Sequence, residues 1–264
     1  MKEYKISFIG AGKVAGTMCR YFYLSGFRIC RIVSRSEAAG PALAASCGAK
    51  WSSVCKFTDS EDIIITAVSD DSLAEVLDSV ICSDRTLVAH TAGSYGLDIF
   101  PARIKHRGVF YPLQTFSANR QINFENLPFF LEASGKRSLS LMTDLARSAG
   151  GRVFNMGTEE RKMIHLAAVF VCNFTNHMLT LGKDIACNAG VTFDVLEPLV
   201  NETVTKAFEL GPENSQTGPA YRFDKGTIKR HIDLLSFSPE MQNIYRQLTR
   251  SIINHYKREG NDQF

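Results

Sequence analysis

Five polar side chains are spaced so that they would lie along one side of a helix in an otherwise apolar stretch, residues 161–181. They are Lys162, His165, Asn173, Asn176 and Thr180. At about 100° per residue they would share an arc about 80° wide, which we call the polar stripe. Burying an unpaired polar group costs about 1–3 kcal/mol. The stripe should therefore face a cleft, or else a hydrogen-bonded network in the core or at a dimer interface. We favour the cleft.

These side chains are suited to reducing a carbonyl or an imine, provided that a hydride donor lies opposite them. The imidazole of His165 can give up a proton near neutral pH, and Lys162 is an alternative donor or an anchor for a carboxylate. Asn173 and Asn176 can orient a substrate. We therefore expect His165, Asn173 and Lys162 to be catalytic and Asn176 to bind substrate.

Two segments outside the stripe add candidate substrate ligands. Gln114 follows an expected strand in Tyr111-Pro112-Leu113-Gln114-Thr115 and could reach the cleft. Arg222 lies two residues before Asp224 in a segment rich in turn-forming residues. Its guanidinium could bind a substrate carboxylate through two parallel hydrogen bonds, or Arg222 and Asp224 could only brace their own loop.

The glycine-rich segment Gly10-Ala11-Gly12-Lys13-Val14-Ala15 follows an expected strand and opens an expected helix. In this context Gly10 allows a tight turn, Gly12 lets the backbone approach a pyrophosphate, and Ala15 keeps the helix close to the sheet. The helix amides would then face the phosphates. A tight turn with nothing bound is the alternative.

The end of the second expected strand indicates which dinucleotide binds. An NAD site usually has an acidic residue there, whereas this chain has Ser34-Arg35-Ser36. A guanidinium and two hydroxyls suit a 2′-phosphate, so we expect NADP; the alternative is that Glu37 binds the ribose. The residues expected to bind the cofactor are Gly10, Gly12, Lys13, Val14, Ser34, Arg35, Ser36, Val68, Ser69, Thr91 and Gly93.

Three further polar residues border these loops. Asp70 and Asp71 resemble a catalytic pair, but we expect them to cap the helix that begins near Ser72. His90 ends an expected strand, and it could either touch the substrate or be hydrogen-bonded within its own loop.

The chain changes its pattern near residue 156. Before it, apolar β-branched runs alternate with helical stretches, which predicts a parallel sheet covered on both faces. Strands are expected at residues 5–9, 28–33, 51–53, 62–68, 86–90 and 108–111, with 128–133 and 152–155 as possible extensions. After it, helical patterns alone remain, and residues 161–181 should form a buried helix. We predict an α/β fold, with a Rossmann NADP-binding domain at 1–156 and an all-helical domain at 157–264.

Bulk properties exclude several classes of function. The net charge of +3 and the lack of a basic, aromatic-rich run argue against nucleic acid, although a mildly basic chain suits an anionic substrate. The seven cysteines form no C-x-x-C pair, so neither a zinc site nor a disulfide framework is expected. No secretory signal and no apolar run near 20 residues is apparent. We expect a cytoplasmic protein that binds neither a membrane nor a metal.

The motifs together resemble a known family, the Rossmann-like NADP oxidoreductases that carry a C-terminal helical domain of unknown function. The matching segments are Phe8-Ile9-Gly10-Ala11-Gly12-Lys13-Val14, Val33-Ser34-Arg35-Ser36, Tyr111-Pro112-Leu113-Gln114-Thr115-Phe116, His165-Leu166-Ala167-Ala168-Val169-Phe170 with Asn173, and Gln216-Thr217-Gly218-Pro219-Ala220 with Arg222, Asp224 and His231.

Broader relatives are the deazaflavin-dependent NADP reductases, pyrroline-carboxylate reductases, and 6-phosphogluconate and β-hydroxyacid dehydrogenases. This resemblance implies a 6-phosphogluconate-dehydrogenase-like helical domain that mediates a homodimer. It also suggests a small 2-oxo acid substrate such as ketopantoate. In the β-hydroxyacid and ketopantoate enzymes a catalytic lysine stands four residues before an asparagine, but here Val169 stands four before Asn173. The lysine role therefore does not carry over, which favours His165. The alternative function is a non-catalytic NADP-binding regulator or scaffold.

Overall fold

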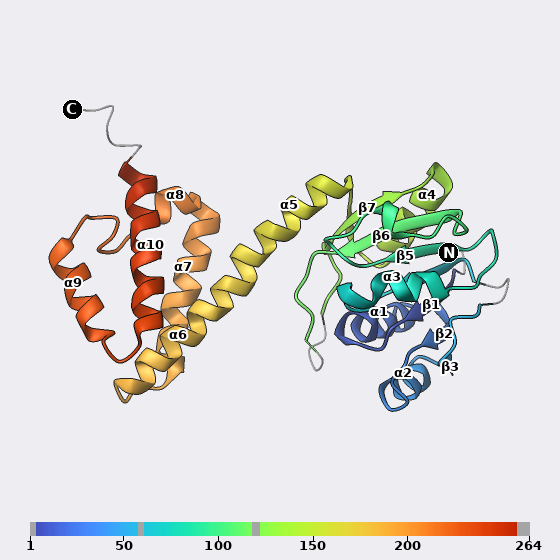
Figure 1. Cartoon of the computed structure of the whole chain (residues 1–264), viewed down its shortest axis with the longest axis horizontal. Coiled ribbons are helices and arrows are strands. Elements are labelled where there is room, and N and C mark those ends of the chain that lie inside the picture. Colours follow the sequence, from blue (N-terminus) through green and yellow to red (C-terminus); the bar gives the residue numbers. More distant parts are fainter. Residues whose placement is uncertain (1–3, 58–60, 118–121, 258–264) are drawn as a thin grey trace. The chain divides into compact units, whose positions relative to one another are not determined.

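A computed structural model describes residues 4–57, 61–117 and 122–257 of the chain (Figure 1). It divides into two compact units, Met1–Asn173 and Phe174–Phe264. The predicted domain boundary after residue 156 lies just before the helix that begins at Thr158. The division after Asn173 falls within this helix, and the domain boundary after residue 156 stays a prediction.

The first unit is built on one eight-stranded sheet with the strand order β3-β2-β1-β4-β5-β6-β7-β8. The strands are β1 (Lys5–Ile9), β2 (Arg28–Val33), β3 (Lys50–Ser52), β4 (Ile63–Thr66), β5 (Leu87–His90), β6 (His106–Pro112), β7 (Pro128–Ala133) and β8 (Arg152–Asn155). All neighbours pair in parallel except β6 and β7, which are antiparallel. The expected Rossmann sheet is thus confirmed, with the two possible extensions included.

Helices cover both faces of this sheet. They are α1 (Lys13–Leu24), α2 (Ala39–Ser46), α3 (Asp70–Ser79) and α4 (Lys136–Ser148), with a short 3₁₀ turn at Leu97–Ile99. Ile63, Ile64 and Ile65 of β4 are all fully buried, because successive side chains point to opposite faces and each face has its own core. One core is formed with α1, α2 and α4, and the other with α3. This explains why the strands read as unbroken apolar runs.

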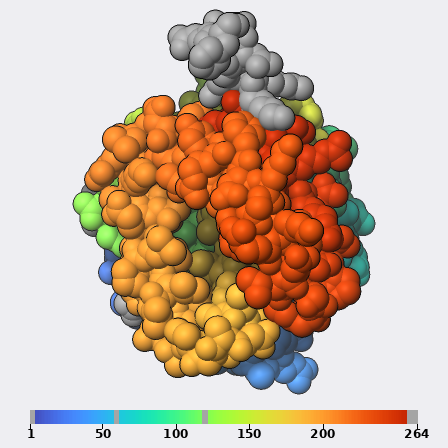
Figure 2. Space-filling view, turned by 90° about the vertical axis from the view of Figure 1, so that its left-hand side faces the viewer, coloured from blue at the N-terminus to red at the C-terminus, as the bar shows by residue number. Residues whose placement is uncertain are grey.

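The second unit is helical. It holds α6 (Thr175–Asn188), a 3₁₀ turn (Phe193–Leu196), α7 (Glu197–Leu210), α8 (Pro212–Ser215), α9 (Lys225–Leu234) and α10 (Pro239–Lys257). Asp224 caps α9 by accepting a hydrogen bond from the amide of Thr227, and the Ser238 hydroxyl accepts one from the amide of Met241 at the start of α10. On the face shown in Figure 2, a hollow separates the orange side chains of α7 from the redder ones of α9 and α10. The segment between α7 and α9 contains the short helix α8.

The long apolar helix differs from its prediction in two ways. Residues Thr158–Asn188 form one continuous helix, but α5 (Thr158–Ala168) and α6 are joined by a π-helical segment at Val169–Phe174. The helix is also exposed within the chain rather than buried: Val171, for example, is 70% exposed. With 31 residues and a mean hydropathy of 1.3, the helix is long and apolar enough to cross a membrane by length and composition. No apolar run of that length was expected from the sequence.

Candidate functional site

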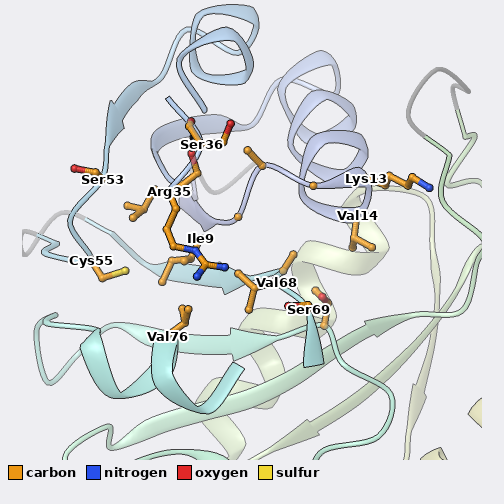
Figure 3. Close-up of a pocket in the computed structure, with 17 residues that line it drawn as sticks. Ile9, Lys13, Val14, Arg35, Ser36, Ser53, Cys55, Val68, Ser69 and Val76 are labelled. Atoms are coloured by element: carbon orange, nitrogen blue, oxygen red, sulfur yellow. Dashed lines mark hydrogen bonds between the residues drawn. The ribbon is translucent and has the colours of Figure 1, made fainter. Parts of the chain in front are cut away.

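A cavity of about 650 Å³ lies where the loops after β1 to β5 meet (Figure 3). Ligands of open α/β sheets bind at this edge, outside the carboxyl ends of the strands. Ten of the eleven residues expected to bind the cofactor line the cavity, namely Gly10, Gly12, Lys13, Val14, Ser34, Arg35, Ser36, Val68, Ser69 and Thr91. The other lining residues, which are not among the eleven expected to bind the cofactor, are Ile9, Ala11, Val33, Ser53, Cys55, Ala67 and Val76. Of these, Ser53 and Cys55 could have been found as the residues that follow the third strand.

The two glycines of the loop have different structural roles. Gly10 has a φ of +115°, and a Cβ on it would lie 2.2 Å from the carbonyl oxygen of Ala67. It therefore lets the ends of β1 and β4 come together. Gly12 has an ordinary φ of −76°, and a Cβ there would meet no atom of the described residues within 4 Å. Glycine at that position thus leaves open space beside the backbone, as a bound pyrophosphate would require.

The start of α1 offers unpaired amides to an anion. Gly12 is the N-cap residue, no side chain among the described residues caps the helix, and the first turn has no acidic residue. Lys13 adds a positive charge at the rim of the cavity (Figure 3). The partial positive charge of a helix N-terminus favours phosphate, so these residues fit the pyrophosphate of a dinucleotide.

At the end of β2 the structure separates the roles of the two serines. The Ser34 hydroxyl accepts a hydrogen bond from Nε1 of Trp51 at 3.2 Å and donates one to the carbonyl of Ser36, and its residue is only 8% exposed. Ser36 is exposed, and its oxygen accepts a bond from the Ala39 amide. Arg35 points into the cavity (Figure 3). A 2′-phosphate would thus find Arg35 and Ser36 available, with Ser34 bracing the loop.

Glu37, the alternative ligand for the ribose, lies outside the cavity. Glu37 is exposed and is not among the residues that line the cavity. A carboxylate that accepts bonds from ribose hydroxyls would have to face the cavity. The geometry therefore favours a phosphate at the 2′ position.

A histidine and a tyrosine meet at the carboxyl end of β6, in the same unit as the cavity. The hydroxyl of Tyr111 lies 2.9 Å from Nδ1 of His165, although 54 residues separate them in the chain. A Cβ on Gly93 would lie 3.0 Å from the imidazole and 3.1 Å from Cζ of Tyr111. Gly93 does not line the cavity, but Thr91, two residues before it, does. The pair is therefore packed on the loop after β5, whose residue Thr91 lines the cavity.

A buried ion pair fixes the helix that carries His165. Arg161 is fully buried, and its Nη1 lies 2.6 Å from Oε2 of Glu132 on β7. Its other terminal nitrogen donates to the carbonyl of Tyr95, and the hydroxyl of Thr158 also donates to Glu132. Arg161 and Glu132 thus hold the first turn of α5 to the sheet, one turn before His165. No role was expected for Arg161 or Glu132 from the sequence. The position of Arg161, a charged residue at the start of an apolar stretch, could have indicated its role.

His90 has a structural role, the second of its two expected roles. It is fully buried, its Nδ1 accepts a hydrogen bond from the amide of Ala92, and its Nε2 contacts the carbonyl of Gly96 at 3.2 Å. Burial lowers the pKa of His90 to about 4, so that it stays neutral at physiological pH. It therefore shapes the loop that carries Gly93.

The helix after β4 begins earlier than predicted. Ser69 is the N-cap residue of α3, while Asp70 and Asp71 lie in the first turn. They do not cap the helix through their side chains; as first-turn acids they are favourably placed at the helix dipole.

The remaining predicted site residues are spread over the chain. Lys162 forms an ion pair with Glu159 at 2.8 Å, the side-chain oxygen of Gln114 accepts from the amide of Thr115 at 2.8 Å, and Asn173 ends the first unit in the π-helical segment. Asn176 and Arg222 belong to the second unit. A π-helix has wider i→i+5 turns, so the 100° spacing behind the polar stripe does not hold beyond residue 168.

Comparisons with known families and structures agree with this fold. The family model described as NADP oxidoreductase coenzyme F420-dependent matches residues 5–93, and that of a domain of unknown function matches residues 127–252. No curated protein matches the chain.

Among solved structures, a Bacteroides fragilis protein provisionally named an NADP oxidoreductase is 36% identical, with a TM-score of 0.89 over 96% of this chain and 98% of that one. A Thermotoga maritima protein is 22% identical, with a TM-score of 0.72 over 96% and 99% of the two chains. A reductive aminase from Aspergillus terreus in complex with NADPH and ethyl-5-oxohexanoate is 12% identical, with a TM-score of 0.71 over 98% and 95%. The last two likenesses show a shared fold.

Proposed function

The chain belongs to the family of NADP oxidoreductases that includes this Bacteroides fragilis protein, and on that premise we propose that it reduces the carbonyl or imine group of a small compound. The predictions of an NADP-dependent enzyme and of its family are confirmed by this membership, which argues against a non-catalytic regulator. The observation that supports a reductase is the Tyr111–His165 pair, packed on Gly93 in the loop whose residue Thr91 lines the cavity. Such a pair can protonate a group that accepts a hydride.

The residues divide the work as follows. The amides at the start of α1 hold the pyrophosphate, while Arg35 and Ser36 hold the 2′-phosphate. Bound NADPH supplies the hydride. His165 protonates the oxygen or nitrogen that is being reduced. We keep Asn173 and Lys162 as further candidates for catalysis, and Gln114, Asn176 and Arg222 as candidates for binding substrate.

The proposed substrates are anionic, because the resemblance implies small 2-oxo acids and Arg222 offers a guanidinium. A panel of 2-oxo acids, with ketopantoate among them, and of cyclic imines covers both kinds of acceptor. Loss of the absorbance of reduced nicotinamide in the presence of one of these compounds is the expected result.

Replacing Arg35 by alanine should weaken NADPH binding about 10- to 100-fold and leave NADH binding nearly unchanged, because only NADPH has a 2′-phosphate. Fluorescence titration can measure both affinities, since Trp51 is the only tryptophan and is hydrogen-bonded to Ser34 beside the cavity. Arg28→Ala, at the other end of β2, is the matched control. Equal affinity of the unmodified protein for NADPH and NADH would contradict the assignment of Arg35 to the 2′-phosphate. A loss of affinity on replacing Glu37, and not on replacing Arg35, would contradict it too.

We also propose a cytoplasmic homodimer that forms through the helical part of the chain. The helix Thr158–Asn188 and α7 expose large apolar side chains, with Val171 70% and Phe208 89% exposed. A second copy would remove this surface from water. All seven cysteines are free thiols, and the cytoplasm is an environment that keeps thiols reduced.

The expected mass in solution is twice the 29.3 kDa of the chain. Val171→Asp should shift it toward the monomer, because a charge would then enter the apolar interface. Val54→Asp, at a site 61% exposed in the first unit, should leave it unchanged. Light scattering that gives a monomer for the unmodified protein would exclude this assembly.

A further inference from the structure

We propose that Tyr111 and His165 form a proton relay, in which His165 passes a proton from Nε2 to the substrate while Tyr111 passes its own proton to Nδ1. Tyr111 is thus a positioning and proton-supplying residue that acts through His165. This inference rests on the proposed reductase function and adds a second residue to its proton transfer.

The contact between the two side chains has the geometry that a relay needs. The Tyr111 oxygen and His165 Nδ1 are 2.9 Å apart, which is a normal hydrogen bond for a hydroxyl and a ring nitrogen. The rings meet edge to face at 74°, and the backbone of Gly93 is packed against both. Among the described residues, none is hydrogen-bonded to Nε2 of His165. Nδ1 is therefore occupied by Tyr111, and Nε2 remains available to donate to a substrate.

The charges around Tyr111 suit a group that gives up its proton only transiently. Burial raises the pKa of the Tyr111 phenol, the positive charge of Arg161 opposes that rise, and Asp70 and Cys172 add to it. A phenol with a raised pKa keeps its proton throughout the neutral range and remains available as a donor. Arg161 is fully buried and held by Glu132, so its guanidinium would stabilise the phenolate when it forms.

The transfer balances in protons and electrons. The Nε2–H bond of neutral His165 breaks as a new O–H or N–H bond forms on the substrate. In the same step the O–H bond of Tyr111 breaks and an Nδ1–H bond forms, which leaves a neutral imidazole and a phenolate. After the product leaves, Nδ1 returns its proton to the phenolate and Nε2 takes a proton from water, which restores both groups to their starting state. Without Tyr111, the imidazole could give a proton only from its doubly protonated, cationic form.

The pH dependence of Tyr111→Phe tests the relay. The unmodified enzyme should keep its kcat/KM as the pH rises, since its proton comes from a phenol. The variant should match it within a few-fold at acidic pH and lose activity as the pH rises, because it depends on the imidazolium. Phenols and imidazoles ordinarily titrate near 10 and 6.5, so the alkaline limb should move down by about two pH units or more.

A purely structural role for Tyr111 would lower activity equally at every pH, and that result would overturn the relay. Tyr95→Phe, which removes a hydroxyl from the neighbouring loop, should leave the profile unchanged. If neither the unmodified protein nor the variant reduces any compound in the panel, the proposed function fails and the relay with it.

Nitrogen NMR of His165 tests the direction of the hydrogen bond without any substrate. In the unmodified protein, Nδ1 should be an acceptor and Nε2 should carry the proton. In Tyr111→Phe the two tautomers should mix. A protonated Nδ1 in the neutral, unmodified protein would overturn the relay even if the enzyme proved to be an active reductase, so the two failures can be told apart.

Discussion

Replacing His165 by alanine should lower kcat by about 10²- to 10⁴-fold and leave the Kd for NADPH unchanged. The imidazole is hydrogen-bonded to Tyr111 and packed on Gly93, and it is not among the residues that line the cofactor cavity. Its loss should therefore affect the proton transfer and spare the cofactor. Steady-state kinetics with the best substrate of the panel, together with a Trp51 titration, measures both effects.

His106→Ala is the matched control for this variant. His106 lies at the amino end of β6, the strand whose carboxyl end carries Tyr111, so it is remote from the loops that border the cavity. Normal turnover by His165→Ala would show that another group, such as Lys162, donates the proton. Weakened NADPH binding without a fall in kcat would mean that His165 contacts the cofactor instead.

Replacing Gly12 by alanine should abolish most NADPH binding while the protein remains fully folded. A Cβ at residue 12 meets no atom within 4 Å, and the φ of −76° suits alanine, so the fold should be as stable as before or slightly more so. The methyl group would occupy the space proposed for the pyrophosphate. We expect the Kd for NADPH to rise by at least about tenfold, since one displaced charge-assisted hydrogen bond costs about 1.5–3 kcal/mol.

Gly10→Ala provides the contrast. A Cβ there would lie 2.2 Å from the oxygen of Ala67 at a φ of +115°, which costs at least about 1–3 kcal/mol in backbone strain alone. This variant should therefore unfold at a lower temperature, whereas Gly12→Ala should not. Thermal unfolding and fluorescence titration distinguish the two effects. If Gly12→Ala bound NADPH normally, the pyrophosphate would not lie on this loop.

The Rossmann half could be predicted from sequence because its signals are local. A buried parallel strand such as β4 reads as an apolar run, and the loops that follow such strands gather at one edge of the sheet by topology alone. The predicted ligands around Gly12 and Arg35 therefore line a common cavity. The direction of β7 depends on how the chain returns after β6, and no local pattern encodes it.

The catalytic end was harder to predict because its contacts join distant segments. Nothing near Tyr111 or His165 indicates that they meet across 54 residues, or that Arg161 would be buried against Glu132. The polar stripe assumed a regular α-helix, and the π-helical segment at Val169–Phe174 broke that assumption. The apolar composition of the same helix suggested burial within one chain, although the structure leaves it exposed.

The direct transfer of a labelled hydride tests the central claim, that this protein is an NADPH-dependent reductase. NADPH that carries deuterium at C4 of its nicotinamide is mixed with the enzyme and with each 2-oxo acid or cyclic imine. The mass of the product is then measured by mass spectrometry. We predict one deuterium on the reduced carbon of at least one product, formed by the unmodified protein and, at the same low NADPH concentration, formed much more slowly by Gly12→Ala. Tight binding of NADPH without transfer to any compound of the panel would contradict the claim.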